Sequence, residues 1–297
     1  VLGAAGDLTD NYAVTVVPGQ LTITPTTVSA AQIAMADVAT VYDGQPRSLA
    51  LPQSLALGAQ TIDLTDMDRF SYAFTAQDTL VAGAPEAAVV GNPAYVNASA
   101  HRVTLRITDE TGSLVLAPVS ANVTIAKRDV LITPNSGTFG YDGAPHTVTG
   151  NDNPKADGTD DTGFIGDDYA ALALTGNTRT GAGSNDIGWV YPAALAHGDL
   201  NNYNLIMGAG TITVEQAAEL TLTLTPDSGV YNARSHSFTY AAGEPDADAL
   251  RLSYSVDGTS WTAFESAADL PAYTDAGSYP LYLRAESDNF AAPAQAV

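Results

Sequence analysis

The sequence predicts an all-β protein made of tandem β-sandwich modules, and three observations lead to that prediction. Apolar residues alternate with polar ones along short runs, turn dipeptides separate these runs, and a tyrosine-centred turn recurs at domain-sized intervals. Alternation with a period of two places one face of a strand on a core and the other face in water. No stretch of the chain has a convincing helical period longer than two turns.

Alternating apolar residues mark strands from the first residues to the last third of the chain. Asp-Gly, Pro-Gly and Asn-Pro dipeptides lie between these runs at strand-length intervals, as expected for short strands joined by turns. Two Ala-rich stretches, 192–197 and 263–269, are the places where a short helix is expected. The alternating residues are Val14 and Val16; Leu21 and Ile23; Val103, Leu105 and Ile107; Val123 and Ile125; and Leu220, Leu222 and Leu224.

The strongest organising pattern is a repeat. A Tyr-Asp-Gly turn at Tyr42 returns at Tyr141, and a related Tyr-Asn-Ala turn follows at Tyr231, so the tyrosines lie 99 and 90 residues apart. A second motif, Asn-Tyr followed by a Thr-Ile-Thr strand, occurs at residues 11–12 and 202–203. The pair Asn-Phe at residues 289–290 is a late form of this motif, with no such strand after it.

These motifs divide the chain into four pieces. Residues 1–25 are expected to be the terminal strands of a preceding repeat, and residues 26–127 and 128–216 to be complete first and second repeats. Residues 217–297 are expected to be a third repeat, immunoglobulin-like and lacking its last strand. A chain that starts with the end of one repeat and stops before the end of another is expected to be a slice of a longer array.

The third repeat carries the sharpest fold marker. Asp275, Gly277 and Tyr279 stand in the Asp-x-Gly-x-Tyr pattern of the immunoglobulin tyrosine corner, in which the tyrosine bonds back to the preceding chain. The residue two positions later, Leu281, is then expected to point into the core. His101 takes the place of the tyrosine in the first repeat, and the second repeat has no aromatic residue at its turn. The second repeat is therefore left open between an immunoglobulin-like sandwich and a β-grasp-like fold.

Nearly the whole chain resembles a family of bacterial repeats. The Tyr-Asp-Gly turns, the Asn-Tyr and Thr-Ile-Thr-Pro ends, and the stretch Gly-Phe-Ile-Gly-Asp at 163–167 are similar to MBG/YDG-type repeats of bacterial surface and secreted adhesins. The third repeat is similar to the bacterial immunoglobulin-like repeats of the same large proteins. The resemblance implies an extracellular, non-enzymatic array, secreted or on the bacterial cell surface, that spaces or presents a binding tip. It supplies no catalytic residues. Because Tyr42, Tyr141 and Tyr231 recur along the chain, we expect them to anchor the fold.

Composition narrows the function classes. The chain has 33 acidic and 11 basic residues, a formal charge of −22, which argues against nucleic-acid binding because such proteins neutralise phosphates with Lys and Arg. There is no cysteine, so disulfides, thiolate metal sites and cysteine nucleophiles are excluded. No apolar run approaches the roughly 20 residues that span a bilayer, so membrane insertion of this segment is not expected. No histidine pair has metal-ligand spacing, and no nucleophile or phosphate-binding motif is present.

An acidic loop is the one candidate for a metal site. Asp157, Asp160 and Asp161 are oxygen ligands of the kind that Ca²⁺ takes in sets of six to eight. The helix-loop-helix calcium pattern fits poorly, because Thr162 stands where it requires glycine and Asp168 where it calls for glutamate. A solvated, self-repelling loop is the competing interpretation, and we favour it.

Trp189 and Trp261 are the candidates for a ligand site, since exposed aromatic rings stack on sugars. The competing interpretation, for Trp261, is that its ring covers the end of a sandwich just after the Asp-Gly turn at 257–258. The leading functional hypothesis is a stalk whose partners are neighbouring repeats of the same chain. One alternative is a set of modules that bind host glycans or proteins. Another is a fibre subunit, in which the leading strand of one molecule completes the third repeat of the next.

Overall fold

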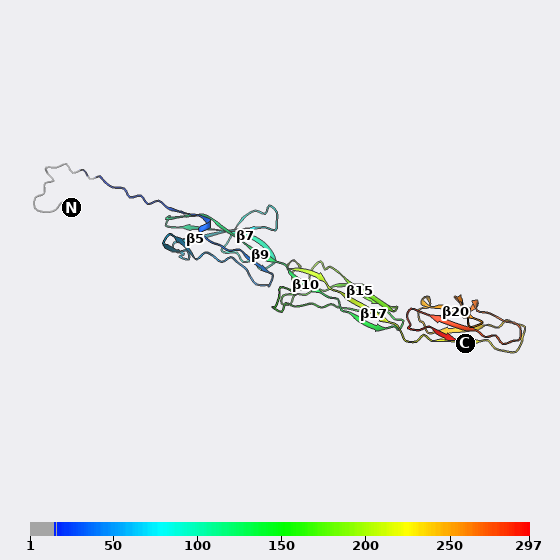
Figure 1. Cartoon of the computed structure of the whole chain (residues 1–297). Coiled ribbons are helices and arrows are strands. Elements are labelled where there is room, and N and C mark those ends of the chain that lie inside the picture. The colour runs from blue at the N-terminus through cyan, green and yellow to red at the C-terminus, as the bar shows by residue number, and fades with distance from the viewer. Residues whose placement is uncertain (1–14, 16) are drawn as a thin grey trace, which may run out of the picture. The chain divides into compact units, whose positions relative to one another are not determined.

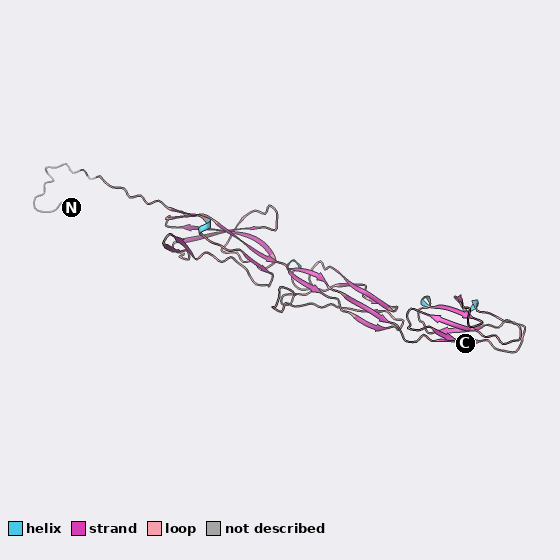
Figure 2. Ribbon diagram, viewed as in Figure 1, coloured by secondary structure: helices cyan, strands magenta, loops and turns pink. Residues whose placement is uncertain are grey.

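The computed structural model describes residue 15 and residues 17–297 (Figure 1). Regular structure in this part of the chain is almost entirely β, which confirms the predicted all-β class (Figure 2). The described helices are 3₁₀ segments of three residues each: η2 (Ala30–Gln32), η3 (Leu200–Asn202), η4 (Ala247–Ala249) and η5 (Ala267–Asp269).

The chain forms two compact units. The first contains the residues up to Thr40 and Gln45–Ala126, and the second contains Val41–Gly44 and Lys127–Val297. The four residues Val41–Gly44 are therefore flanked on both sides in sequence by residues of the first unit, but they belong to the second unit. The boundary between the predicted second and third repeats lies inside the second unit, and those repeat boundaries stay a prediction.

The first unit is a sandwich around one core. Its large sheet has the order β2-β9-β7-β5-β6, with the antiparallel pairs β5–β7 and β7–β9 at its centre, and strands β1 and β8 form a parallel pair. Val28 of β1 and Leu116 of β8 belong to the same apolar cluster as Phe70 and Leu105 of the large sheet. The strands are β1 (Thr26–Val28), β2 (Val38–Val41), β3 (Ser54–Leu57), β4 (Gln60–Asp63), β5 (Phe70–Asp78), β6 (Ala87–Val89), β7 (Ser99–Asp109), β8 (Leu114–Leu116) and β9 (Val119–Ala126).

In the second unit, the strands from β10 to β17 are divided among separate sheets. β10 pairs in parallel with β16, whereas a four-stranded sheet has the order β11-β17-β15-β13. The successive strands β16 and β17 therefore lie in different sheets. The buried side chains of Val148, Ile187 and Ile212 form a small hydrophobic core in this part of the unit. The strands are β10 (Arg128–Ile132), β11 (Gly137–Gly140), β12 (His146–Thr147), β13 (Ala173–Thr175), β14 (Thr178–Arg179), β15 (Gly183–Val190), β16 (Tyr203–Met207) and β17 (Gly210–Glu215).

The remainder of the second unit is a second pair of sheets with its own core. One sheet has the order β21-β20-β22-β23 and the other is the antiparallel pair β18–β19. Leu220, Leu252, Phe264 and Leu283 are central members of the apolar cluster between them. The strands are β18 (Leu222–Pro226), β19 (Phe238–Ala242), β20 (Arg251–Ser255), β21 (Thr262–Phe264), β22 (Tyr282–Glu286) and β23 (Ala294–Ala296).

The segment before β22 has the geometry of a tyrosine corner. Tyr279 Oη donates to the backbone carbonyl of Asp275 over 3.1 Å, and the Tyr279 ring stacks on Tyr273 at 3.8 Å between centroids. A Cβ at Gly277 would lie 2.9 Å from Cζ of Tyr279, so the ring needs glycine beneath it. Leu281, two residues after the tyrosine, is 2% exposed and belongs to the core.

Two expectations about the chain ends are corrected. Residues 17–25 contain no strand, and Leu21 and Ile23 are exposed. Alternation gives this segment one apolar side, but no neighbouring strand among the described residues pairs with it by hydrogen bonds. Asn11 and Tyr12 of the predicted preceding repeat lie outside the described residues. The third repeat does have a last strand: β23 pairs antiparallel with β22, because backbone pairing does not require β-branched residues.

Of the two short helices expected from Ala-rich sequence, one is absent and the other is confined to three residues. Residues 192–197 form bends and a bridge rather than a helix, and within 263–269 only η5 is helical, after the strand β21. Alanine favours helix, but six or seven residues are too few to offset the cost of nucleation without tertiary support. In β21, cross-strand pairing with β20 overrides the propensity.

Candidate functional site

The acidic loop uses its carboxylates to fix its own turns. Asp157 Oδ1 accepts from the backbone N–H and the hydroxyl of Thr159, and Asp160 Oδ1 accepts in the same way from Thr162. The hydrogen bonds from Thr159 hold the pKa of Asp157 below its ordinary value. In the part of the chain that the structure describes, no three His, Asp or Glu side chains come together in a group that can hold a metal ion. Asp157, Asp160 and Asp161 therefore do not belong to such a group, and their loop is held by its own hydrogen bonds.

The cation that this loop encloses is an arginine. Arg128, the first residue of β10, is 3% exposed, and its guanidinium donates to the backbone carbonyls of the loop. Nη2 donates to Asp160 O and Thr162 O, each over 2.8 Å, and Nε donates to Thr162 O and Gly163 O, each over 3.0 Å. The exposed Asp161 carboxylate lies 3.8 Å from Nη1. The buried charge is thus satisfied mainly by carbonyl dipoles, as the cost of burying an unpaired charge requires.

The loop can take this path because of one glycine. Gly163 has φ +82°, and a Cβ there would lie 2.7 Å from the carbonyl carbon of Lys155. A side chain would be strained by the backbone conformation and would meet another stretch of backbone. Gly163 is part of the Gly-Phe-Ile-Gly-Asp stretch, so this motif positions the carbonyls around Arg128.

Arg128 also holds the first tyrosine turn. Its Nη1 donates to the backbone carbonyl of Tyr42 over 3.3 Å. The Tyr42 side chain is 8% exposed and meets the ring of Tyr203 edge to face, with centroids 5.5 Å apart. Tyr203 is fully buried, packs edge to face on Phe164, and donates from Oη to Asp168 Oδ2 over 2.7 Å. The turn from Val41 to Gly44 is therefore bound by the residues that follow Lys127.

Burial and charge act together on these two phenols. Burial, followed by the charge of Asp168, raises the pKa of Tyr42, and a hydrogen bond with Asn202 opposes the rise. Burial and the hydrogen bond to Asp168 raise the pKa of Tyr203 well above its ordinary value. Both phenols are accordingly neutral throughout the physiological range.

The second tyrosine turn is bound in the same manner. Tyr141 is 8% exposed and meets the ring of Phe290 edge to face, with centroids 5.6 Å apart. Its hydroxyl donates to Glu244 Oε1. Gly143 has φ +79°, and a Cβ there would lie 2.6 Å from Cγ of Pro245. The turn from Tyr141 to Gly143 therefore fits directly against the residues around Glu244.

Glu244 is the centre of a buried polar network. Besides the Tyr141 hydroxyl, it accepts from Ser287 Oγ, from Asn289 Nδ2 over 3.2 Å and from the backbone N–H of Asp246 over 3.1 Å. Burial by itself raises the pKa of Glu244, but the hydrogen bonds from Ser287, Tyr141, Asp246 and Asn289 outweigh it and leave the pKa below its ordinary value. The glutamate is therefore an ionised acceptor held by hydrogen bonds from neutral donors.

The two sequence motifs of the repeat meet in both places. Tyr42 contacts Tyr203, which follows the buried Asn202, and Tyr141 contacts Phe290, which follows the buried Asn289. We call each such contact a tyrosine joint: the turn tyrosine of one predicted repeat against the Asn-aromatic pair of the next. The second joint has a further bond, from the backbone N–H of Ala182 to Asn289 Oδ1 over 2.9 Å. The recurring motifs mark the tyrosines of both joints, whereas neither Arg128 nor Glu244 belongs to a recurring motif.

The predicted aromatic ligand residues do not form a common site. Trp189, in β15, is partly buried and stacks on Tyr191 with centroids 5.7 Å apart, and its indole N–H is buried without a hydrogen-bond partner among the described residues. Trp261 immediately precedes β21 and is 37% exposed. Each tryptophan borders a separate pair of sheets, so they offer no shared stacking surface.

The comparisons with known proteins add no family. No protein-family model matches the chain, and no curated protein matches it. Among the described residues, no helix has the length and apolar character needed to cross a bilayer.

Acid is expected to loosen the second joint. Because the pKa of Glu244 is lowered on folding, its contribution to stability is present above the unfolded value of about 4.3 and is lost as the pH falls through the folded value. Because the pKa of Tyr141 is raised to about 12, its contribution is present below the unfolded value of about 10 and is lost as the pH rises towards the folded one. Amide exchange of residues 287–291, corrected for intrinsic rates, should therefore accelerate at both extremes. Glu244→Gln should remove the acceleration at low pH. If that variant still showed the same acceleration at low pH, Glu244 would not be the group responsible.

Proposed function

We propose that this chain is a stalk or spacer segment of a large bacterial adhesin-like protein, exposed at the cell surface or secreted, without enzymatic activity of its own. The observation that supports the proposal is the tyrosine joint. Two turns that recur in the sequence are each buried by an Asn-aromatic pair more than 140 residues further along the chain. Such contacts serve to hold one repeat on the next, which is what a spacer requires.

The chemistry of the joints suits a mechanical role. Apolar contacts alone resist separation but leave orientation loosely defined, whereas buried hydrogen bonds are directional and costly to leave unmade. The second joint combines the Tyr141 and Phe290 rings with the carboxylate of Glu244 and the amide of Asn289. Bending at this joint would break several buried hydrogen bonds together. The charge of −22 also keeps an array of such repeats soluble and discourages edge-to-edge association of strands.

The proposal is tested by loosening the second joint. Tyr141→Ala removes the ring and the hydroxyl that link the predicted second and third repeats, so we expect small-angle scattering to show greater flexibility and a wider spread of dimensions than in the unsubstituted chain. Tyr240→Ala, at a partly buried ring inside the third repeat, is the matched control: it weakens one repeat without touching the joint. Scattering that is identical for Tyr141→Ala and the unsubstituted chain would refute the stalk.

The fibre alternative has lost the observation on which it rested. It required an open position for a last strand in the third repeat, and β23 occupies a place beside β22, with Ala285 opposite Ala294. The structure offers no comparable specific observation in favour of glycan binding at Trp189 or Trp261. The stalk is therefore the function that we propose.

A further inference from the structure

The third tyrosine turn has the same local build as the second. Asn232 Oδ1 accepts from the backbone N–H of Arg234 over 2.9 Å, just as Asp142 Oδ1 accepts from Ala144 over 2.8 Å. His236 contacts Asn232 Oδ1 at 3.1 Å, and His146 contacts Asp142 Oδ1 at 3.0 Å. The turn is therefore formed in full by its own residues.

The backbone of this turn is also alike. Ala233 has φ +59°, where Gly44 has +74° and Gly143 has +79°. Ala233 is the one described residue other than glycine with a positive φ, and that conformation is strained for a residue with a Cβ. The left-handed position is thus kept even where the sequence no longer supplies glycine.

What differs is the exposure of the tyrosine. Tyr42 and Tyr141 are each 8% exposed, whereas Tyr231 is 63% exposed. In the first two turns, Tyr203 and Phe290 supply the covering ring. No described aromatic residue packs on Tyr231 in this way. Local sequence builds the turn, and a second repeat buries it.

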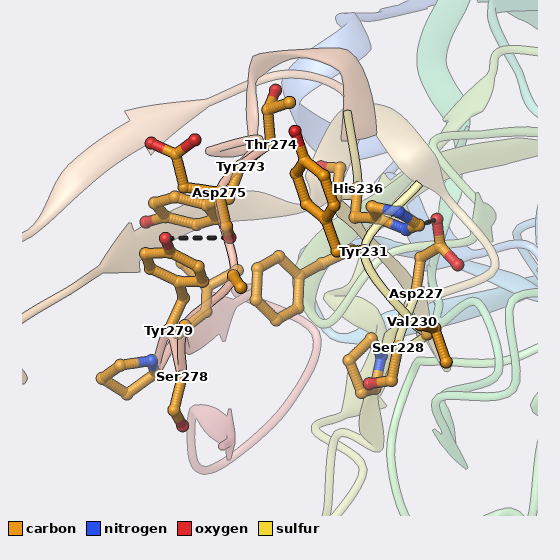
Figure 3. Close-up of a pocket in the computed structure, with 18 of the residues that line it drawn as sticks. Asp227, Ser228, Val230, Tyr231, His236, Tyr273, Thr274, Asp275, Ser278 and Tyr279 are labelled. Carbon is orange, nitrogen blue, oxygen red and sulfur yellow. Dashed lines mark hydrogen bonds and ion pairs between the residues drawn. The ribbon is translucent and has the colours of Figure 1, made fainter. Parts of the chain in front are cut away.

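Tyr231 stands in an open cleft of about 580 Å³ (Figure 3). Tyr273 and Tyr279 form one wall with their stacked rings, and His236, bonded to Asp227, lies on the other side. Val297, the residue after β23, also lines the cleft. In the second repeat, too, the end of the last strand lies at the turn, where the backbone N–H of Tyr141 donates to Glu215 O over 2.9 Å.

We propose that the Tyr231 turn is a docking surface for another repeat of this kind, whose Asn-aromatic pair packs onto Tyr231. The inference rests on the proposed function and names the partner that this function implies at one particular surface. It follows from two turns in the same chain whose tyrosines are buried by such a pair and a third turn of the same build whose tyrosine is exposed.

Ala233 decides which kind of repeat fits. A Cβ at Gly143 would lie 2.6 Å from Pro245, so a turn with alanine at this place collides with a repeat like the third. A Cβ at Gly44 would lie 3.2 Å from Cγ2 of Ile165, the far end of a flexible side chain that can shift. The partner of the Tyr231 turn is therefore a repeat like residues 128–216, with the equivalents of Arg128 and Tyr203.

The test lengthens the full chain by one repeat. A second copy of residues 128–216 is placed directly after Val297, which reproduces the spacing from β9 to Arg128. We expect amide exchange of residues 230–234 to slow by about tenfold or more relative to the parent chain, because the turn then opens only when the joint opens. Tyr231→Ala should restore fast exchange in the lengthened chain and should change little in the parent, where the ring is exposed.

A second lengthened chain gives the matched control. A copy of residues 217–297 after Val297 brings Pro245 against Ala233, so residues 230–234 should remain fast, and Ala233→Gly should then slow them. The inference would be overturned if residues 230–234 exchanged fast in both of two chains. The first is the chain lengthened by the copy of 128–216, and the second is the chain lengthened by the copy of 217–297 that also carries Ala233→Gly. Binding of the parent chain to a glycan array that Tyr231→Ala abolishes would also overturn it, since the cleft would then be a sugar site. The scattering of Tyr141→Ala is independent of these outcomes, so the stalk proposal can fail or stand separately.

Discussion

Arg128→Met is expected to destabilise the part of the second unit around β10 by about 3–5 kcal/mol, because several backbone carbonyls lose their donor and each buried polar group left unsatisfied costs about 1–3 kcal/mol. The substitution keeps the length of the side chain but leaves the buried bonds to the carbonyls of Tyr42 and Gly163, and the part-buried bond to that of Thr162, without their donor. Urea denaturation followed by amide exchange in β10 and β16 measures the loss.

Two further arginine variants isolate the cause. Arg128→Lys keeps the charge but offers one ammonium group, which cannot reach carbonyls spread around a planar guanidinium, so most of the loss should remain. Arg251→Met removes an exposed ion pair with Asp288 and should leave stability almost unchanged. If Arg128→Met were as harmless as Arg251→Met, the acidic loop would not be organised by the arginine.

Glu244→Ala is expected to destabilise the second joint by about 2–4 kcal/mol, since three buried side-chain donors lose an ionised acceptor. The donors are Tyr141, Ser287 and Asn289. Tyr141→Phe removes one of these bonds and keeps the ring, so its cost should be smaller, about 1.5–3 kcal/mol for a bond to a charged group. Amide exchange in residues 287–291 and chemical denaturation of the full chain measure both.

A double-mutant cycle tests whether the tyrosine and the glutamate act as a pair. Because they share a hydrogen bond, the combined variant should be less destabilised than the sum of the single variants. Thr225→Ala, in the exposed face of β18, is the control, and its effect should add to that of Glu244→Ala without coupling. Additive energies for Tyr141→Phe and Glu244→Ala would contradict a shared network.

The fold was predictable where the pattern is local. Alternation placed strands at Val103, Leu105 and Ile107, which lie in β7 with their side chains buried. The short corner motif placed Leu281 in the core, where it lies. The strand expected at Leu21 and Ile23 is absent and β23 is present, because a strand depends on a partner that alternation does not reveal.

The joints were predictable only in part. The spacing of Tyr42 and Tyr141 identified them as recurring residues, but the aromatic rings that bury them lie in the next repeat, and no local pattern links the two. Glu244 was one of 33 acidic residues with nothing in its neighbours to distinguish it. Arg128 had a usable clue, since it is one of only 11 basic residues and precedes an acidic loop. The acidic loop is held to Arg128 by backbone carbonyls, and a pattern of carboxylates in the sequence does not reveal such acceptors.

The membership of Val41–Gly44 in the second unit bears on how this protein can be divided. A fragment that starts at Lys127 keeps every strand from β10 onward but discards the ring that covers Tyr203 and one acceptor of Arg128. Such a fragment would expose aromatic surface on expression and invite aggregation, although its boundary looks clean in sequence. Truncations and proteolytic fragments of this chain are better judged by which turn they remove than by where a repeat begins.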